Sequence, residues 1–270
     1  MSEKNAILLG SDTELFVMNP ETGKMSSVAG VLGADKFNKK TVAEDVRIQE
    51  DNVLIEWDIN PHNKIDSFIS NIETAHALSK EEANKVGLQV VEGVCSHIYT
   101  EEDLKSFHKD AFLFGCEPSF NALTGAMNEK PVSKNIGLRT AGGHIHFGYS
   151  HIREVSQHSN QVLGVMCDYF LGLPSLTLDT DTQRRELYGK AGEVRFKNYG
   201  VEYRTLSNFW TFNKDNIKFI WDQCQKAYTH LANDTFMEIV SIISPEEVQA
   251  VINRNDKKLA EQYIKLIKIC

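Results

Sequence analysis

Residues 139–148 have the sequence RTAGGHIHFG, in which polar and apolar side chains alternate after a pair of glycines. His144 and His146 alternate with apolar residues, which is the two-residue period of a β-strand. Both imidazoles are therefore predicted to lie on one face of a strand that begins near Gly142 and Gly143. Two adjacent glycines let the backbone come close to a ligand, and their amides would be able to hold a phosphate.

The same two-residue spacing of polar residues occurs in three other strand-like segments. A strand face that is merely solvated favours Thr, Ser, Lys and Gln, whereas these segments carry mostly carboxylates. Crowded carboxylates repel one another unless cations neutralise them. Since no cysteine belongs to the set, we expect a cavity that holds several hard ions, Mg²⁺ or Mn²⁺. The pairs are Asp12 with Glu14, Glu56 with Asp58, and Glu202 with Arg204.

A cation-rich segment with two glycines, RRELYGKAGEVRFK, spans residues 184–197. Cations that face a carboxylate–metal cavity are typical of a site for a polyphosphate, because they stabilise charge on a transferring phosphoryl group. Taken alone, the segment is equally consistent with a solvated basic loop. The chain has no G-x-x-x-x-G-K-[ST] motif and no G-x-G-x-x-G motif after a strand, so the common nucleotide-binding folds are not supported.

The order of the predicted elements favours an α+β fold. Strands are predicted over 6–17, 52–60, 139–149 and 200–206, and helices over 65–86, 152–171, 215–233 and 256–267, with one more beginning at 244. The strands do not alternate regularly with helices, so we expect a mixed or mainly antiparallel sheet backed by helices. No internal repeat or interdomain linker is evident. We therefore expect one catalytic domain over 1–270, with a helical C-terminal part, 213–270, packed on it.

Composition and charge restrict the class of protein further. The 270 residues carry a net charge of −8, which argues against a surface built for nucleic-acid backbone. No apolar run approaches the roughly 18 residues of a membrane-spanning helix, and the N-terminus does not resemble a signal peptide. The five cysteines are scattered and never form C-x-x-C, which is typical of reduced thiols. We expect a cytoplasmic protein without a membrane partner.

Five ordered segments together resemble the phage-type carboxylate–amine ligases, amidoligases of the glutamine-synthetase-like superfamily. They are GSDTELF (10–16), EDNVLIEWDINP (50–61), FGCEPSFN (114–121), RTAGGHIHFG (139–148) and YGVEYRTLSNFW (199–210). The resemblance runs from about residue 8 to residue 212, and it implies a curved, mainly antiparallel sheet whose concave face holds ATP and several Mg²⁺. In that scheme ATP phosphorylates a carboxylate, and an amine then displaces the phosphate to leave an amide.

The resemblance also assigns roles to individual residues. The implied metal ligands are Asp12, Glu14, Glu56, His144 and Glu202, with Asp51 as a further candidate. The implied contacts to ATP and phosphate are His146 and, with no choice made among them, Arg184, Arg185, Lys190 and Arg195. Arg204 matches the arginine that meets the γ-phosphate or the acyl phosphate. Glu117 and Asp58 are candidates for removing the proton from the amine.

Two features depart from the glutamine synthetases. Asp12 stands where those enzymes have a longer Glu, so the metal nearest to it would sit differently. The chain is also much shorter than theirs, which argues against their large rings, although an oligomer stays open.

Three alternatives to a ligase stay open at this stage. A kinase of the same superfamily would transfer phosphate to a guanidino or amine group. A metal-dependent hydrolase would use the H-x-H motif and carboxylates to activate water without ATP. A non-catalytic descendant would only bind a nucleotide or a partner, although the complete set of paired ligands argues against it. The carboxylate and the amine are expected to be small molecules or peptides, and a modified nucleotide stays possible.

Overall fold

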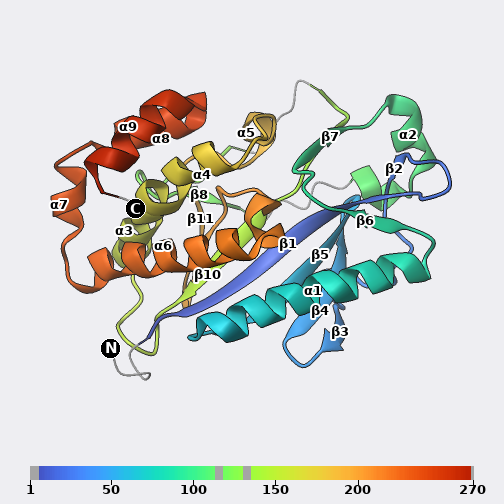
Figure 1. The fold of residues 1–270 in the computed structure, drawn as a ribbon, viewed down its shortest axis with the longest axis horizontal. Helices are drawn as coiled ribbons and strands as arrows, with labels where there is room; N and C mark the ends of the chain where they lie inside the picture. The colour runs from blue at the N-terminus through green and yellow to red at the C-terminus, as the bar shows by residue number, and fades with distance from the viewer. Residues whose placement is uncertain (1–5, 113–117, 130–134, 269–270) are drawn as a thin grey trace.

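A large antiparallel sheet organises the computed structural model, which describes residues 6–112, 118–129 and 135–268 (Figure 1). The strand order is β3-β4-β5-β1-β10-β12-β11-β8, and β2 and β6 extend β1 beyond this path. Every pairing between the described strands is antiparallel. The strands are β1 (Leu8–Met18), β2 (Met25–Ser26), β3 (Lys40–Ala43), β4 (Val46–Asp51), β5 (Leu54–His62), β6 (Gln89–Val91), β8 (Phe120–Asn121), β10 (Gly143–Gly148), β11 (Glu193–Lys197) and β12 (Gly200–Tyr203).

The strand predicted over 139–149 is divided in the structure. Its first part is β9 (Leu138–Thr140), which pairs with β7 (Ser96–Ile98) in a separate two-stranded sheet. Its second part is β10, in the large sheet. The chain changes sheets at Ala141, whose N–H donates to Cys95 O, and Gly143, whose N–H donates to Leu206 O. These partners are distant in the sequence, so local alternation did not reveal the break.

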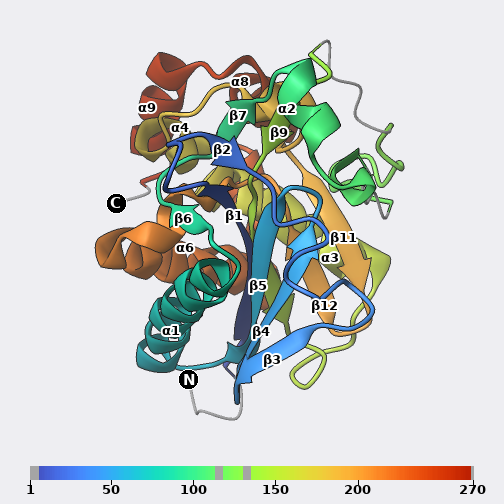
Figure 2. The same cartoon turned by 90° about the vertical axis from the view of Figure 1, so that its right-hand side faces the viewer.

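Helices cover one face of the large sheet. Helix α1 (Ile65–Lys85) packs on β5, and α3 (Gln157–Cys167) packs on β11 and β12 and on α6 (Lys214–Ala232). Figure 2 shows α1 and α6 on the same side of β1 and β5. Alternation gives this face its apolar residues, among them Leu15 and Trp57, both fully buried. Burying each such side chain stabilises the folded protein by about 1.5–3 kcal/mol. The helices therefore pack on this apolar face and leave the opposite face of the sheet uncovered by them.

The helical run after β10 is longer than predicted. The sequence predicts a helix that ends near residue 172, but a π-helical segment, Asp168–Gly172, leads directly into α4 (Leu173–Leu178). Leu173 N–H donates to Asp168 O, five residues back, immediately before Pro174, which has no N–H to donate. By length and composition the run Gln157–Leu178 would be able to cross a membrane, contrary to the sequence expectation, but 78% of its most apolar window is buried inside the protein. That burial is typical of the central helix of a core.

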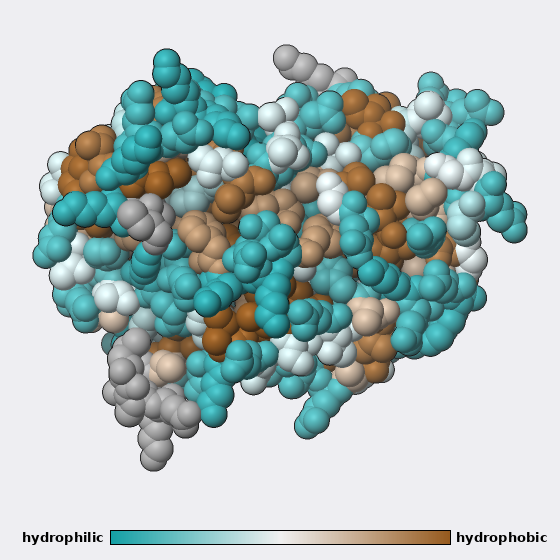
Figure 3. Space-filling view, viewed as in Figure 1, coloured by the Kyte–Doolittle hydropathy of each residue, from teal (hydrophilic) through white to brown (hydrophobic). Residues whose placement is uncertain are grey.

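The C-terminal part is helical, as predicted. It comprises α6, α7 (Phe236–Val240), α8 (Pro245–Arg254) and α9 (Lys257–Leu266), after the short α2 (Glu101–Ser106) and α5 (Arg184–Leu187) earlier in the chain. Asn213 caps α6, Ser244 caps α8 and Asp256 caps α9. The main hydrophobic core includes residues from Ile7 to Ile267, so these helices share it with the sheet. Figure 3 shows hydrophobic residues on the surface near α9, where Leu266 is exposed. The α+β class with a mainly antiparallel sheet and a helical C-terminus is thus confirmed.

Candidate active site

The face of the sheet opposite the helices collects the polar pairs that the sequence singled out. Directly opposite residues in an antiparallel sheet share a face, and the register places Asp12 between Asp58 and His144. Glu14 lies opposite Glu56, and Glu202 lies between a histidine of β10 and a cation of β11, His146 and Arg195. Segments that are far apart in the sequence therefore contribute to one polar face.

Three of these side chains form a group suited to a metal ion. The ligand atoms of Asp12, His146 and Glu202 all lie within 4.8 Å of one another. Glu202 is only 1% exposed, and the other two are half-buried. Carboxylate oxygens with one imidazole are a donor set that Mg²⁺ or Mn²⁺ accepts. The described residues therefore fit the divalent ion that the sequence predicts.

Asp12 joins the two histidines of the H-x-H motif. Its Oδ1 lies 2.7 Å from Nδ1 of His144, and its Oδ2 lies 3.1 Å from Nε2 of His146. Burial raises the pKa of Asp12, but the two histidines outweigh burial and hold it well below its usual value. Burial lowers the pKa of His146, but Asp12 outweighs burial and raises it, whereas burial and Arg204 lower the pKa of His144 to about 4. The pair Asp12–His146 thus favours the charged state.

The two histidines have different surroundings. His144, predicted as a metal ligand, lies outside the three-residue group, and its Nε2 faces the backbone of Gly142 so closely that a Cβ there would lie 2.3 Å from it. His146, predicted to lie near the ATP phosphates, belongs to the group instead. Of the two histidines, His146 alone belongs to the described group that is suited to a metal ion, and the i, i+2 spacing does not reveal this difference.

Three more carboxylates form a second acidic cluster, Glu14, Asp51 and Glu56. A side-chain hydrogen bond joins Asp51 to Glu14, and Gln49 Nε2 donates to Glu56 Oε2 at 2.5 Å. Burial raises the pKa of all three, and repulsion from Asp51 contributes to raising the pKa of Glu14 to about 7. Repulsion from Asp12 adds to the shift of Glu56, which rises well above its usual value. Nearby cations, Arg204 and Lys39 among them, do not offset burial and repulsion, so a further cation would relieve the cluster.

The opposite charge balance holds around Glu202. Its carboxylate is paired with Arg204, with Arg195 Nη1 at 3.2 Å and with Lys197 Nζ at 3.2 Å. Burial raises the pKa of Glu202, but Arg204 above all outweighs burial and lowers it to about 2. The Nε atoms of Arg195 and Arg204 are buried without a hydrogen-bond partner among the described residues. Three cations facing one carboxylate leave an excess of positive charge that suits an anion.

The other predicted cations lie elsewhere. Arg184 is 4% exposed, and its guanidinium donates to three backbone carbonyls, each at 3.2 Å, those of Ala141, Arg204 and Thr205. Arg185 donates to Ser175 Oγ at 3.1 Å and to Asn255 Oδ1 at 3.3 Å, and Lys190 is exposed on the loop before β11. Arg184 thus ties together the backbone behind the site.

The amides of the two glycines are already engaged by protein acceptors. Gly142 N–H donates to Glu14 Oε2 at 2.5 Å, and Gly143 N–H donates to Leu206 O at 3.1 Å. A Cβ at residue 143 would lie 2.7 Å from Trp210 Nε1. Close packing therefore accounts for both glycines, and neither amide is free to hold a phosphate in this arrangement.

Of the two residues predicted to deprotonate the amine, the structure describes only Asp58. Glu117 lies outside the described residues. Asp58 is paired with Arg47, whose Nε donates to Oδ1 at 2.6 Å, and with Lys39, whose Nζ lies 2.8 Å from Oδ2. Both oxygens of Asp58 are therefore already engaged by cations.

Several residues of the polar face were not singled out from the sequence as site residues. Glu193 accepts from Gly189 N–H at 2.9 Å and pairs with Arg204 Nε at 3.9 Å. Glu193 and Lys197 stand two residues on either side of Arg195, so the alternation of β11 would have found them. Tyr199 lies in the turn between β11 and β12, where no periodicity points to it.

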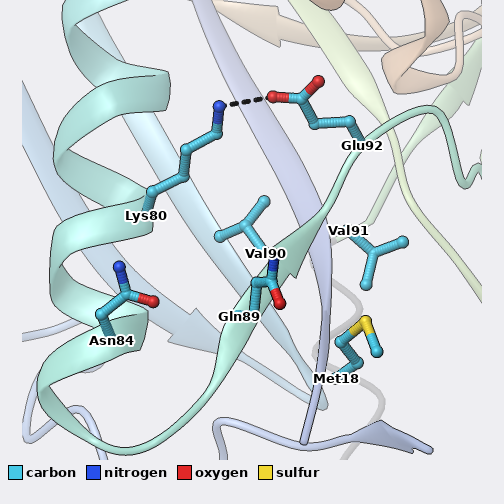
Figure 4. A pocket seen from close by; sticks show the side chains of 7 residues that line it. All are labelled: Met18, Lys80, Asn84, Gln89, Val90, Val91 and Glu92. Atoms are coloured by element: carbon cyan, nitrogen blue, oxygen red, sulfur yellow. Dashed lines mark ion pairs between the residues drawn. The ribbon is translucent and has the colours of Figure 1, made fainter. Parts of the chain in front are cut away.

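A cavity of about 460 Å³ lies away from this face, between α1 and β6 (Figure 4). Lys80 and Glu92 form an ion pair across it, and Asn84, Gln89, Met18, Val90 and Val91 complete its lining. None of the polar-face residues lines it, so it offers no cation-binding group to the candidate site.

Comparison with known proteins identifies a family and solved structures that are similar to the chain. A family model described as "Phage phiEco32-like COOH.NH2 ligase-type 2" matches residues 123–266. A solved structure described as "Crystal structure of novel glutamine synthase homolog" is similar over 97% of this chain and 71% of that chain, at 11% identity and a TM-score of 0.35. No curated protein matches the chain. The matched segment includes His144, His146, Glu202 and Arg204, whereas Asp12 lies before it.

Proposed function

Because the chain belongs to the phage phiEco32-like COOH.NH2 ligase type 2 family, we propose that it joins a carboxylate to an amine in an ATP- and Mg²⁺-dependent reaction. Mn²⁺ would replace Mg²⁺ at the same ligands. In this proposal the carboxylate is first activated as an acyl phosphate. The substrates are small molecules or peptides, one bearing a carboxylate and the other an amine.

The proposal rests on the position of Glu202, which lies between the three-residue metal group and a set of cations. Its carboxylate belongs to the group of Asp12 and His146, and it is also paired with Arg195 and Lys197 of β11 and with Arg204, which directly follows β12. A metal ion at the first group would therefore lie next to a region of excess positive charge. Triphosphates bound with Mg²⁺ need such a combination, whereas a hydrolase that activates water needs only the metal.

Divalent ions would be held by two sets of ligands in this scheme. Asp12, His146 and Glu202 form one set, and Glu14, Asp51 and Glu56 form the other. Bound Mg²⁺ would neutralise triphosphate oxygens and relieve the repulsion among the carboxylates. His144 would support the first set by holding Asp12 Oδ1 at 2.7 Å.

The cations of the polar face would bind and stabilise the phosphoryl group. An oxygen of the substrate carboxylate attacks the γ-phosphorus of ATP, ADP leaves, and an acyl phosphate forms. The amine nitrogen then attacks the acyl carbon, loses its proton, and phosphate leaves. Arg195, Lys197 and Arg204 would oppose the charge that develops on the transferred group. In this proposal Glu117 takes the proton from the amine.

Calorimetry and product analysis together test the proposal. The purified chain is titrated with a non-hydrolysable ATP analogue with and without Mg²⁺, alongside Asp12→Asn, Glu202→Gln and Arg195→Met. Arg185→Met is the matched control, because it removes the same charge from a residue that contacts Ser175 and Asn255 instead. We expect Mg²⁺-dependent binding that the first three variants weaken at least tenfold and the control leaves unchanged.

ADP release is then followed across acid–amine pairs, with hydroxylamine added in parallel. An acyl phosphate would be trapped as a hydroxamate, and full turnover would need both the acid and the amine. ADP release with an amine or guanidine alone would indicate a kinase. Bond cleavage with metal and without ATP would indicate a hydrolase, and either result would refute the ligase.

A further inference from the structure

Tyr199 contacts His146, a member of the predicted metal group, at the ring nitrogen that faces away from Asp12. It lies in the turn between β11 and β12, and its carbonyl accepts from Tyr149 N–H at 2.9 Å and from Ser150 N–H at 3.2 Å. These bonds fix the turn to the end of β10, the strand that carries His146. The Tyr199 hydroxyl lies 2.7 Å from Nδ1 of His146, and the two rings lie 6.2 Å apart with a tilt of 43°.

The hydrogen bond between Tyr199 and His146 matters because the two ring nitrogens of His146 face different partners. Nε2 lies 3.1 Å from Asp12 Oδ2, on the side of the three-residue group, and Nδ1 faces the tyrosine. A nitrogen that binds a metal must present a lone pair, so the proton of a neutral imidazole must then lie on the other nitrogen. With Nε2 toward the metal, Nδ1–H needs an acceptor, and Tyr199 Oη is placed to accept it.

His144 provides an internal contrast on the same strand. Its Nδ1 faces Asp12 Oδ1 at 2.7 Å, and its Nε2 packs against Gly142. Both nitrogens of His144 are thus engaged, whereas Nε2 of His146 faces the three-residue group because Nδ1 is bonded to Tyr199. The partner is a carboxylate for His144 and a hydroxyl for His146.

We propose that Tyr199 is a positioning residue for His146, fixing the ring so that Nε2 presents its lone pair to a divalent ion beside Asp12 and Glu202. The inference rests on the proposed function, because it assigns a partner to one ligand of the metal site. A hydroxyl suits the role, since its oxygen accepts from Nδ1–H both when the charged imidazole donates Nε2–H to Asp12 and when a metal displaces the Nε2 proton.

Mn²⁺ affinity without nucleotide is the first measurement. Tyr199→Phe removes only the hydroxyl, and we expect Mn²⁺ affinity to fall about 10–100-fold, the usual effect of losing a partner of a metal-binding histidine. Tyr149→Phe is the matched control, because its hydroxyl bonds to Ser159 and Asn160 in α3. It should lower stability and leave Mn²⁺ affinity within about twofold of the wild type.

A second arm asks whether the effect acts through His146. In the His146→Ala background, Tyr199→Phe should change Mn²⁺ affinity no further. In the Mg²⁺-loaded wild type, ¹⁵N spectra of the imidazole should show the proton on Nδ1, and Tyr199→Phe should broaden or shift those signals. Equal Mn²⁺ affinity in Tyr199→Phe and wild type, or an equal loss in the His146→Ala background, would overturn this inference alone. Failure of the wild type to bind Mn²⁺ would overturn the proposed metal site and the inference together.

Discussion

Tyr203 on β12 donates a hydrogen bond of 2.8 Å to Asp168, a buried carboxylate in the helical run behind the sheet. Asp168 also accepts from Gly192 N–H at 2.8 Å and from Gln249 Nε2 at 2.9 Å. Successive residues of a strand point to opposite faces, so Tyr203 is held on the helix side while Glu202 faces the candidate site. One carboxylate thus connects α8, the loop before β11 and the strand that carries the site.

The first prediction concerns this connection. In Asp168→Asn, one oxygen becomes an NH₂ group facing the NH₂ of Gln249, whose own oxygen accepts from Asn121 Nδ2. Two facing donors should lower the free energy of unfolding by about 1–3 kcal/mol. Adding Gln249→Glu supplies acceptors to both neighbours, so the double variant should recover most of the loss. Urea unfolding of the four proteins measures the coupling, and simple additivity would contradict the assignment of these bonds.

The second prediction is a pH dependence that originates at Asp168. Burial raises its pKa to about 6, above the value of 3.8 in an unfolded chain, although Gly192, Gln249 and Tyr203 oppose the shift. Between these values the folded protein binds more protons than the unfolded chain, so stability falls as pH rises and levels off above pH 6 or so. The full change is about 3 kcal/mol. Wild type should therefore lose stability relative to Asp168→Asn between about pH 4 and pH 7, and a constant difference would refute the shift.

The third prediction separates structural from ligand-binding arginines. Arg184→Met removes three hydrogen bonds to backbone carbonyls, although Ala141 O keeps the one from Asn208 N–H, so the variant should lower the free energy of unfolding by about 3 kcal/mol. Arg185→Met should cost about 1 kcal/mol, because Arg185 is only partly buried and loses two hydrogen bonds to side chains. Denaturant titration compares the two. Weakened ATP binding by Arg184→Met with unchanged stability would show instead that Arg184 binds the nucleotide.

The fourth prediction tests the packing at Gly142. A Cβ there would lie 2.3 Å from His144 Nε2 and 2.9 Å from Arg184 Nη2, so Gly142→Ala should lower stability by about 1–3 kcal/mol. It should also displace His144 from Asp12 and weaken Mn²⁺ binding. Gly10→Ala is the matched control on the neighbouring strand, where the nearest atoms are 3.4 Å or more away. Thermal unfolding and Mn²⁺ titration of both variants provide the comparison, and similar behaviour would contradict the packing argument.

The fifth prediction gives two ligands opposite responses to one substitution. Lys197 Nζ lies 3.2 Å from Glu202 Oε2, so it repels a metal ion there and attracts a phosphate. Lys197→Met should therefore raise Mn²⁺ affinity several-fold and lower affinity for a triphosphate. Lys218→Met, on the exposed side of α6, makes the same change in net charge and should alter neither. Changes of the same sign for both ligands would contradict the assignment of Lys197 to the anion.

The sequence was most informative where one period persists. The strands expected over 6–17 and 52–60 and the helices expected over 65–86 and 215–233 correspond to β1, β5, α1 and α6. Alternation likewise showed which polar residues share a face. Both are local properties of the chain, so a single sequence contains them.

The features that sequence reasoning missed depend on distant parts of the chain. Strand 139–149 divides because Ala141 and Gly143 bond to Cys95 and Leu206. His146 belongs to the three-residue group and His144 does not, and His144 packs closely against Gly142. The role of Tyr199 depends on a turn that returns its ring to β10. None of these leaves a periodic signal within its own segment.

The chain order of the polar face determines when the site exists during synthesis. Asp12 and its partner His144 are 132 residues apart, and Glu202 follows later still. A growing chain that has emerged only as far as β5 already carries Asp12, Glu14 and Glu56, but none of the cations of β11 and β12. The carboxylates of that nascent sheet repel one another. The cations that offset this repulsion are added only once β10, β11 and β12 have been translated. If the chain binds ATP as proposed, this binding should therefore appear only late in translation.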